Sequence, residues 1–243
     1  MEKYQRKPHA VLELASRRLK AVKIERLLKL NERQAPIRML EIGTGSGGIA
    51  HYFSSNSERN YEVTSVDVID QRAIRGEYHF HLVEDIFLPF PNNYFEVVIT
   101  NHVIEHVGNK NKQLGHLKEL RRVLKTNGIG YLATPNRWMI VEPHFHLAFL
   151  SWLPRSMRST YLQLLQRGEY YDCEPLSLTE LESLLNKAGF EYENICLDAL
   201  HETLRIEGKK GFIEMLAFKM PDRILKQLLY LIPTLIYRFE CNL

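Results

Sequence analysis

The chain has 243 residues, a net charge of +3 and 45% hydrophobic residues, which is ordinary for a soluble globular protein with a substantial core. The small charge of mixed sign argues against a nucleic-acid-binding protein, and no apolar run approaches the roughly 20 residues that cross a bilayer. Three widely spaced cysteines and an N-terminus without an apolar leader predict a cytoplasmic protein without disulfides.

Predicted helices and strands alternate along the first half of the chain. Apolar residues recur with a helical period over residues 8–30, and a second helix is expected at 47–55. A third helix is predicted at 105–125, ended by the Thr126-Asn127-Gly128 turn. Runs rich in apolar and β-branched residues predict strands at 37–42, 61–68, 79–86, 94–102 and 129–134. Continuous apolar strands separated by helices are typical of a parallel sheet covered on both faces.

The second half of the chain departs from this alternation. Residues 135–175 are rich in aromatic residues and histidines but show little periodicity, which predicts an insertion after the fifth strand. Ser177 and Glu180 form a capping-box pattern at the start of a helix that Gly189 ends. The remaining predicted elements are a strand at 191–199, a helix at 211–231 and a last strand at 234–241.

Together these elements predict one α/β domain over residues 1–243. Its sheet is expected to be Rossmann-like, seven-stranded and mostly parallel, with helices on both faces and an antiparallel last strand. The core is predicted at 36–134. The N-terminal helix precedes it, and the insertion at 135–175 and a C-terminal part at 176–243 follow it.

The loop after the first predicted strand is rich in glycine. Residues 41–48, EIGTGSGG, fit the pattern ExGxGxG and also the pattern GxGxxG. Glycine clusters occur where a backbone turns tightly or approaches a ligand, and ligands of doubly wound sheets lie over this loop. Asp67, at the end of the second strand, can accept hydrogen bonds from the ribose hydroxyls of either NAD or S-adenosyl-L-methionine (SAM). The glycines alone would also suit a purely structural turn.

Two later stretches narrow the choice of ligand. EDIFLPFPNNYFEVVITNHVIEHV at 84–107 and LKELRRVLKTNGIGYLATPNR at 117–137 resemble class I SAM-dependent methyltransferases, in particular type 11 and ubiquinone-pathway small-molecule enzymes. The resemblance implies SAM as the cofactor, with Asp85 facing the adenine amino group and Ile86 packed against the ring. The cofactor-binding residues that it implies are Glu41, Gly43, Thr44, Gly45, Gly47, Asp67, Val68, Asp85, Ile86, Asn101 and His102.

Three histidines are candidates for a general base, which a methyl acceptor needs when its nucleophilic atom is protonated. His106 follows the fourth strand in the motif EHV, whereas His144 and His146 lie in the insertion. We interpret residues 135–175 as a lid that binds the acceptor. Its other candidate acceptor contacts are Asn136, Arg137 and Glu142.

The stretch NHVIEHV also resembles EVLEHV of ubiquinone-pathway O-methyltransferases. In those enzymes the acidic pair and the histidine hold a divalent metal. His102 stands here in place of the first carboxylate, which removes an oxygen ligand of the kind that magnesium prefers. We therefore expect no metal at Glu105 and His106.

The predicted function is transfer of a methyl group from SAM to an oxygen of a small-molecule or glycan-like acceptor. The glycan class is suggested by EPHFHLAFLSWLP at 142–154, which resembles type-11 methyltransferases of bacterial glycan assembly. Two alternatives stay open: a nicotinamide-dependent oxidoreductase, favoured by GxGxxG and Asp67, and a non-catalytic binding partner with a methyltransferase fold. The apolar and basic stretch 211–232 would suit a membrane surface, although packing on the sheet is the commoner role of such a stretch.

Overall fold

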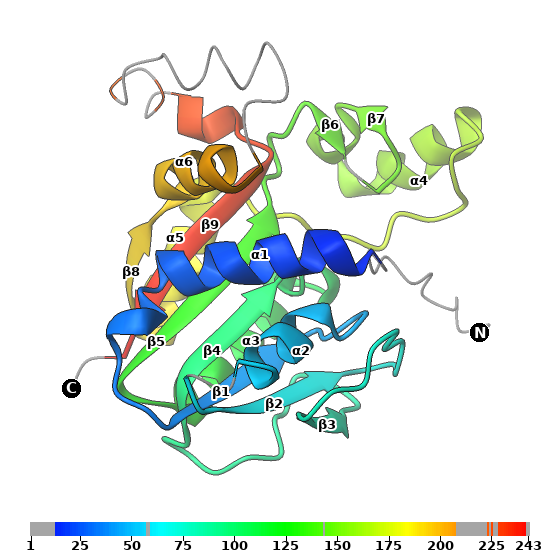
Figure 1. Ribbon diagram of the computed structural model, residues 1–243. Helices are drawn as coiled ribbons and strands as arrows, with labels where there is room; N and C mark the ends of the chain where they lie inside the picture. The colour runs from blue at the N-terminus through cyan, green and yellow to red at the C-terminus, as the bar shows by residue number, and fades with distance from the viewer. Residues whose placement is uncertain are drawn as a thin grey trace.

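A seven-stranded sheet forms the centre of the computed structural model, which describes residues 13–56, 59–142, 144–207, 223, 225 and 228–241 (Figure 1). In spatial order its strands are β3 (His79–Leu82), β2 (Tyr61–Asp67), β1 (Ile37–Ile42), β4 (Phe95–Asn101), β5 (Leu124–Pro135), β9 (Thr234–Glu240) and β8 (Glu191–Asn194). The first five in this order are parallel, whereas β9 runs antiparallel to both β5 and β8. The predicted Rossmann-like sheet with an antiparallel last strand is confirmed.

The order of the strands reverses at β1, which pairs with β2 on one side and with β4 on the other. Both β1 and β4 are buried along almost their whole length, as their continuous apolar sequences predict. The loops that leave such neighbouring strands diverge to opposite faces of the sheet. They leave a crevice at the carboxyl ends of the strands, where ligands of this class of fold bind.

Helices cover both faces of the sheet. On one face lie α1 (Leu14–Leu27), α2 (Gly48–Ser54) and α6 (Cys196–Glu207), whose residues Ile24, Phe53 and Ala199 are buried in one core cluster. On the other face α3 (Lys110–Val123) and α5 (Leu178–Ala188) bury Leu117 and Leu185 in a second cluster. No helix in the described part of the chain is both long enough and apolar enough to span a membrane.

The insertion predicted after the fifth strand is present, and Figure 1 shows it beyond the carboxyl end of β5. It contains the hairpin of β6 (Val141–Glu142) and β7 (Leu147–Ala148), followed by α4 (Arg155–Leu164). A small separate core supports it, formed by Leu147, Leu150, Leu162, Tyr171 and Cys173. The short 3-10 helices of the chain are η1 (Leu30–Glu32), η2 (Ile104–His106), η3 (Leu150–Trp152) and η4 (Leu228–Leu231).

The capping box predicted for α5 is confirmed. Ser177 Oγ accepts a hydrogen bond from the Glu180 amide, and Glu180 Oε2 accepts one from the Ser177 amide at 3.0 Å. Gly189 ends the helix in the left-handed region, with φ +81°.

Several predicted helix boundaries were wrong. The N-terminal helix ends at Leu27 rather than at residue 30, because Lys29 turns the chain with φ +50°. The third helix begins at Lys110 rather than at residue 105, because Asn109 caps it by accepting a hydrogen bond from the Lys112 amide. The same helix ends at Val123, and the turn predicted to stop it at 126–128 lies inside β5.

Two predicted strands were too long. The strand predicted at 79–86 ends at Leu82. The strand predicted at 191–199 ends at Asn194, where Asn194 Oδ1 accepts a hydrogen bond from the Cys196 amide at the start of α6. Residues 8–12 and most of the predicted helix 211–231 lie outside the described residues.

Candidate functional site

The glycine loop joins β1 to α2 and depends on glycine at three positions. Gly43, Gly45 and Gly47 all adopt the left-handed region, with φ +75°, +52° and +81°. A Cβ on Gly43 would lie 2.4 Å from Val103 Cγ2, and one on Gly47 would lie 2.5 Å from the Ile74 carbonyl oxygen. Both the backbone conformation and the close packing therefore exclude larger residues at these two ends of the loop.

Asp67 ties this loop to the end of β2. Its Oδ2 accepts a hydrogen bond from the Gly45 amide at 2.8 Å, and its Oδ1 accepts one from the Val68 amide at 2.7 Å. Thr44 adds a bond from its Oγ1 to the Val66 carbonyl at 3.2 Å and is buried. A carboxylate oxygen accepts more than one hydrogen bond, so Asp67 keeps capacity for a ligand hydroxyl. Val68, the next residue, is 44% exposed.

Glu41 is a buried carboxyl at the start of the same loop. It is only 3% exposed, and its Oε2 has no hydrogen-bond partner among the described residues. Burial raises the pKa of Glu41 to about 8, while the charge of Arg17 and a hydrogen bond from the Ala50 backbone oppose this rise. Buried polar atoms without a partner are rare, so this oxygen points to a missing hydrogen-bond donor.

Asn101, at the end of β4, presents a second buried acceptor of this kind. Its Oδ1 lacks a hydrogen-bond partner within the described chain, as does the hydroxyl of Ser46 in the glycine loop. The carboxyl ends of β1 and β4 are neighbours in the sheet, in a register that pairs Ile42 with Thr100. Three buried polar side chains that each have an atom without a hydrogen-bond partner, Glu41, Ser46 and Asn101, thus lie at the crevice where ligands of this class of fold bind.

Asp85 and Ile86 lie on the loop after β3. Asp85 lies outside the third strand, although the predicted strand at 79–86 included it, because the strand ends three residues earlier at Leu82. Its side chain is 60% exposed and pairs with Lys112 Nζ at 3.4 Å. Ile86 packs near α3, since a Cβ on Gly115 would lie 2.7 Å from Ile86 Cδ1.

His102 follows β4 directly and has a positive φ of +59°. Its Nδ1 lies 3.3 Å from Glu105 Oε1, and the Thr134 hydroxyl at the end of β5 donates to Glu105 Oε2 at 3.1 Å. Burial alone would raise the pKa of Glu105, but the hydrogen bond and charge of His102 outweigh burial and lower it. This buried carboxylate connects the ends of β4 and β5.

On the lid, Glu142 and His144 form a hydrogen-bonded pair. His144 Nδ1 donates to Glu142 Oε1 at 2.7 Å, and the Phe145 amide donates to Glu142 Oε2 at 2.8 Å. Burial would lower the pKa of His144, but the hydrogen bond and the charge of Glu142 outweigh it and raise the pKa. With Nδ1 as the donor, Nε2 is the nitrogen of His144 that takes up a proton.

His106, which follows β4 in the core, contacts two residues of the lid, His144 and Cys173. Its ring centroid lies 5.8 Å from that of His144, and its Nδ1 lies 3.7 Å from Cys173 Sγ. The Glu174 amide, next to Cys173, donates to the Glu105 carbonyl at 2.7 Å. The sequence analysis missed Cys173, because it lies 67 positions from His106 and no local motif contains it.

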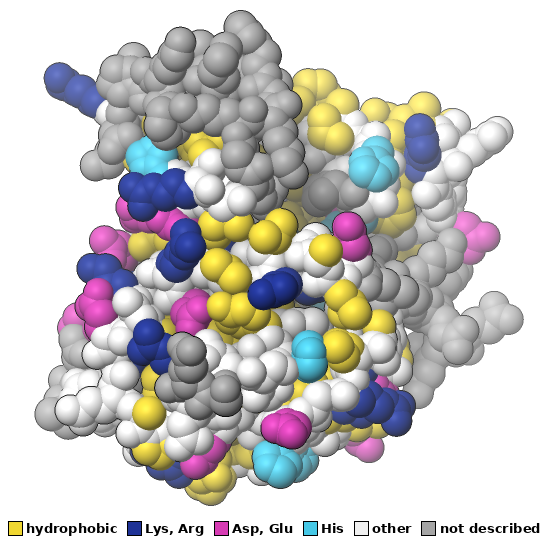
Figure 2. All heavy atoms as spheres, in the orientation of Figure 1, with side chains coloured by type: hydrophobic (Ala, Val, Ile, Leu, Met, Phe, Trp, Pro, Cys, Tyr) yellow, Lys and Arg dark blue, Asp and Glu magenta, His cyan; other side chains and the backbone are white. Residues whose placement is uncertain are grey.

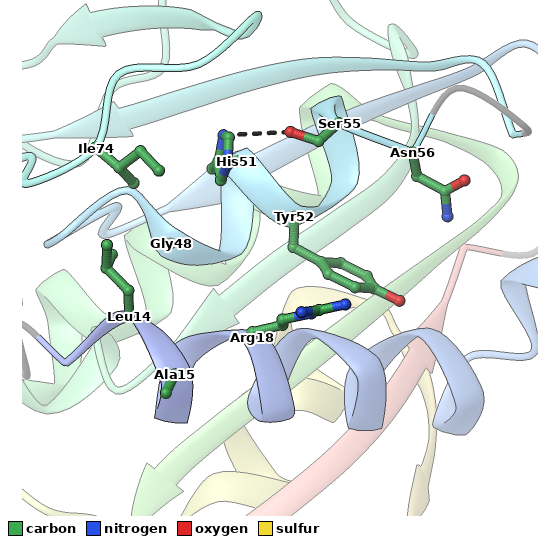
Figure 3. Close-up of a pocket in the computed structure, with 9 residues that line it drawn as sticks. All are labelled: Leu14, Ala15, Arg18, Gly48, His51, Tyr52, Ser55, Asn56 and Ile74. Atoms are coloured by element: carbon green, nitrogen blue, oxygen red, sulfur yellow. Dashed lines mark hydrogen bonds between the residues drawn. The ribbon is translucent and has the colours of Figure 1, made fainter.

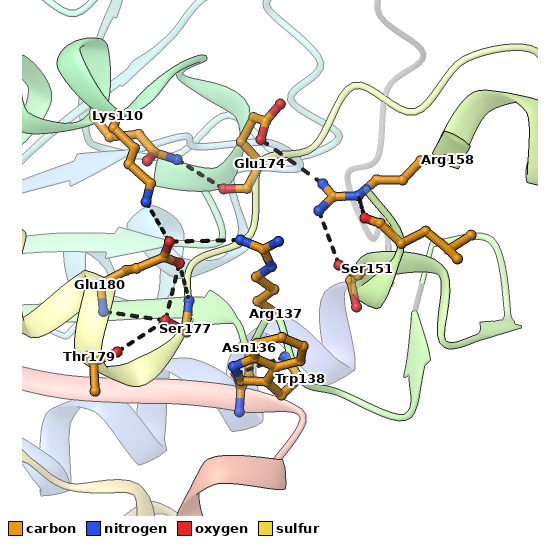
Figure 4. Close-up of polar contacts among 12 residues, drawn as sticks. Lys110, Asn136, Arg137, Trp138, Ser151, Arg158, Glu174, Ser177, Thr179 and Glu180 are labelled. Atoms are coloured by element: carbon orange, nitrogen blue, oxygen red, sulfur yellow. Dashed lines mark hydrogen bonds and ion pairs between the residues drawn. The ribbon is translucent and has the colours of Figure 1, made fainter. Parts of the chain in front are cut away.

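His146 does not join this group. It is exposed and adopts a φ of +53°. Two of the candidate acceptor contacts, Asn136 and Arg137, bind residues outside the lid and so hold its first residues in place (Figure 4). Asn136 is fully buried and donates from Nδ2 to the carbonyls of Tyr230 and Ile232, and Arg137 faces Glu180 at 3.7 Å.

A groove of about 610 Å³ lies between α1 and α2, and Gly48 of the glycine loop is among its lining residues (Figure 3). Leu14 and Arg18 line it from α1, and His51 and Tyr52 line it from α2. None of the predicted cofactor residues lines this groove. The chemistry of the glycine loop, rather than the size of a cavity, therefore identifies the candidate site.

Two known structures, one of a methyltransferase and one of a cyclase, resemble this chain. Plantazolicin methyltransferase BpumL, in complex with a monoazolic desmethylPZN analog and SAH, is 17% identical over 95% of this chain and 85% of that chain, with a TM-score of 0.60. The cyclase SpnF is 15% identical over 99% of this chain and 86% of that chain, with a TM-score of 0.56. At these identities the similarity shows a common fold.

A longer protein matches as well. Phosphoethanolamine N-methyltransferase 2 from Haemonchus contortus, in complex with phosphomonomethylethanolamine and S-adenosylhomocysteine, is 18% identical with a TM-score of 0.54. The match covers 91% of this chain and 52% of that chain, so this chain spans about half the length of that enzyme. No curated protein sequence matches significantly. A family model described as a methyltransferase domain matches residues 12–195, and the chain belongs to this methyltransferase-domain family.

Proposed function

We propose that the protein is a SAM-dependent methyltransferase that methylates an oxygen of a small-molecule or glycan-like acceptor. The observation that carries the proposal is the buried Glu41, whose Oε2 lacks a hydrogen-bond donor beside a left-handed glycine loop. The methionyl ammonium of SAM is a donor of the kind that this oxygen requires. The family match and the SAH complexes of BpumL and of the Haemonchus contortus enzyme support SAM as the cofactor.

The residues at the crevice fit the other parts of SAM. Asp67 would accept hydrogen bonds from the ribose hydroxyls, and Asn101 and His102 would lie beside the methionyl part. Asp85 and Ile86 would contact the adenine, provided that the exposed loop after β3 closes over it. When bound, SAM supplies an electrophilic methyl group on a sulfonium. SAM carries no phosphate, which agrees with a loop that relies on glycines and carboxylates.

The lid, residues 135–175, would hold the acceptor. His144 is the best candidate for the base, because Glu142 fixes its Nδ1 as a donor and leaves Nε2 to take the proton of an acceptor hydroxyl. Glu142 thereby orients the base and stabilises its protonated form. His106 is the second candidate, 5.8 Å away between ring centroids. His146, which is exposed, would contact the acceptor only at the surface of the lid.

The candidate base His144 supports oxygen as the acceptor atom, because an acceptor hydroxyl loses its proton during methyl transfer. The acceptors named for the two neighbours, a desmethylPZN analog and phosphomonomethylethanolamine, agree with a small organic acceptor. The glycan-like class rests on the resemblance of the lid sequence to enzymes of glycan assembly. A cytoplasmic location stays a prediction; the three cysteines are all unpaired and buried, in agreement with it.

An acceptor screen tests the proposal. The purified chain is incubated with SAM labelled on the methyl group and with glycans, nucleotide sugars, quinone precursors and small carboxylic acids. Label should enter one class, and the product should carry a methyl ether or ester. His144→Ala serves as the variant with an intact cofactor site, and its labelling rate should be at least tenfold lower. Methylation on nitrogen or carbon would contradict the assignment of oxygen, and turnover of NAD instead of SAM would contradict the function.

A further inference from the structure

A compact group of side chains with metal-ligand chemistry lies between the core and the lid, apart from the predicted cofactor residues. His106 comes from η2, and Asp172 and Cys173 come from the segment between α4 and α5. One nitrogen, oxygen or sulfur atom of each lies within 4.8 Å of those of the other two. We propose that His106, Asp172 and Cys173 bind a divalent transition metal of the zinc class.

The separations of these atoms fit one metal. Metal–ligand bonds of roughly 2.0–2.3 Å in a tetrahedral site place neighbouring ligand atoms about 3.3–3.8 Å apart. Cys173 Sγ lies 3.7 Å from His106 Nδ1 and 3.6 Å from Asp172 Oδ1. Both distances match those expected between neighbouring ligands of one ion, and the ligand atoms of the third pair, His106 and Asp172, lie within 4.8 Å of each other.

A second group that shares the thiol, Glu142 with His144 and Cys173, fits less well. Glu142 Oε1 and His144 Nδ1 are 2.7 Å apart, which is a hydrogen bond and is too short for two ligand atoms of one metal. The Glu142–His144 pair therefore keeps its role as base and orienting carboxylate. The metal is assigned to the neighbouring set, in which His106 is a ligand and no longer the second candidate base.

The charge around the thiol favours a cation. Cys173 is 2% exposed, and the buried carboxylates Glu105 and Glu142 lie near it in addition to Asp172. The buried hydroxyl of Tyr171 has no hydrogen-bond partner among the described residues. A divalent ion would interact favourably with these carboxylates, and a water bound to it could form a hydrogen bond with this hydroxyl.

The ligand types select the metal. A thiolate, an imidazole and one carboxylate suit zinc or cobalt, whereas magnesium requires oxygen ligands. On binding, the Cys173 S–H bond breaks, the sulfur bonds to the metal as a thiolate, and the proton passes to solvent. Three protein ligands leave one position for water or for an acceptor oxygen. Only the binding of an acceptor oxygen at this position rests on the proposed function. The proposed metal site itself revises the sequence-based expectation that no metal is bound at Glu105 and His106.

Zinc and cobalt binding to the 243-residue chain, stripped of metal with a chelator, test the proposal. Calorimetry with Zn²⁺ should show one site per chain and a release of protons to the buffer. Co²⁺ should give a thiolate-to-cobalt charge-transfer band. In Cys173→Ser the band should disappear and Zn²⁺ affinity should fall at least 100-fold, and Asp172→Asn should lower affinity about tenfold. Cys241→Ser, which removes another buried, unpaired thiol, is the matched control and should bind as the wild type does.

The outcomes separate this proposal from the proposed function. Absence of Zn²⁺ binding at millimolar metal, or an unchanged band in Cys173→Ser, would overturn the metal site. His144→Ala should change Zn²⁺ affinity less than threefold. A large loss of affinity would overturn the assignment of the metal to His106 and Asp172 and would favour the second group. Binding of S-adenosylhomocysteine (SAH), measured on the same samples, reports on the cofactor site alone and also shows that each variant is folded.

Discussion

Replacing Glu41 by Gln should remove one pH-dependent loss of stability. Burial raises the pKa of Glu41 from 4.5 to about 8 in the folded chain. A carboxyl with a raised pKa contributes its stability in full below the unfolded pKa, and this contribution is lost as pH rises through the folded pKa. The wild type should therefore lose stability between pH 4.5 and about pH 8 for this reason. Gln has nearly the same shape and cannot ionise.

The expected size of the effect follows from the two pKa values. At about 1.36 kcal/mol per pKa unit, the free energy of unfolding of the wild type should fall by roughly 4 kcal/mol more than that of Glu41→Gln between about pH 5 and about pH 9. The Gln amide also places a buried N–H₂ where Oε2 has no described partner. That costs about 1–3 kcal/mol at every pH, so the measured quantity is the slope and not the absolute stability.

The assay is urea unfolding of the ligand-free protein at several pH values. Glu62→Gln, which changes an exposed glutamate on β2, controls for the removal of one carboxyl from the chain. Its curve of stability against pH should parallel that of the wild type, while the curve of Glu41→Gln should be flatter. Parallel curves for the wild type and Glu41→Gln would refute the assignment of a buried, protonated carboxyl beside the glycine loop.

Three further predictions concern binding and turnover. Gly45→Val should abolish SAH binding in calorimetry, because Gly45 has φ +52° and its amide holds Asp67; normal binding would show that the loop is only a structural turn. Asp67→Ala should weaken SAH binding by about 1–3 kcal/mol through loss of a charged acceptor, and unchanged affinity would remove Asp67 from the site. His144→Ala should keep SAH affinity but lower turnover at least tenfold, or about 1.4 kcal/mol of barrier, whereas the exposed His146→Ala should change turnover less than threefold. Equal effects of both substitutions would contradict the choice of base.

The fold was largely predictable because its main features are local in sequence. The apolar runs of β1 and β4, the glycines between β1 and α2, and the capping box of Ser177 each act within a few residues. The errors arose where a neighbour in space or a cap decides the boundary. Asn194 accepts a hydrogen bond from the first residue of α6, within the predicted sixth strand. Asn109 caps α3, so this helix begins at a later residue than predicted.

The candidate site was predictable only in part, for the same reason. Glu41 and Asp67 belong to recognisable patterns, and the structure places both at the glycine loop. The pairing of His144 with Glu142 is also short in sequence, although the pattern alone did not distinguish His144 from the exposed His146. The approach of Cys173 to His106 depends on how the lid folds back on the core, and no sequence spacing encodes it.

Calorimetry of cofactor binding tests the central claim most directly. The purified chain is titrated with SAM, with SAH and with NAD under identical conditions, and Asp67→Ala is titrated in parallel. We predict micromolar binding of SAM and SAH, much weaker binding of NAD, and a loss of SAH affinity in the variant. Tighter binding of NAD than of SAM, or no binding of either, would contradict a SAM-dependent methyltransferase.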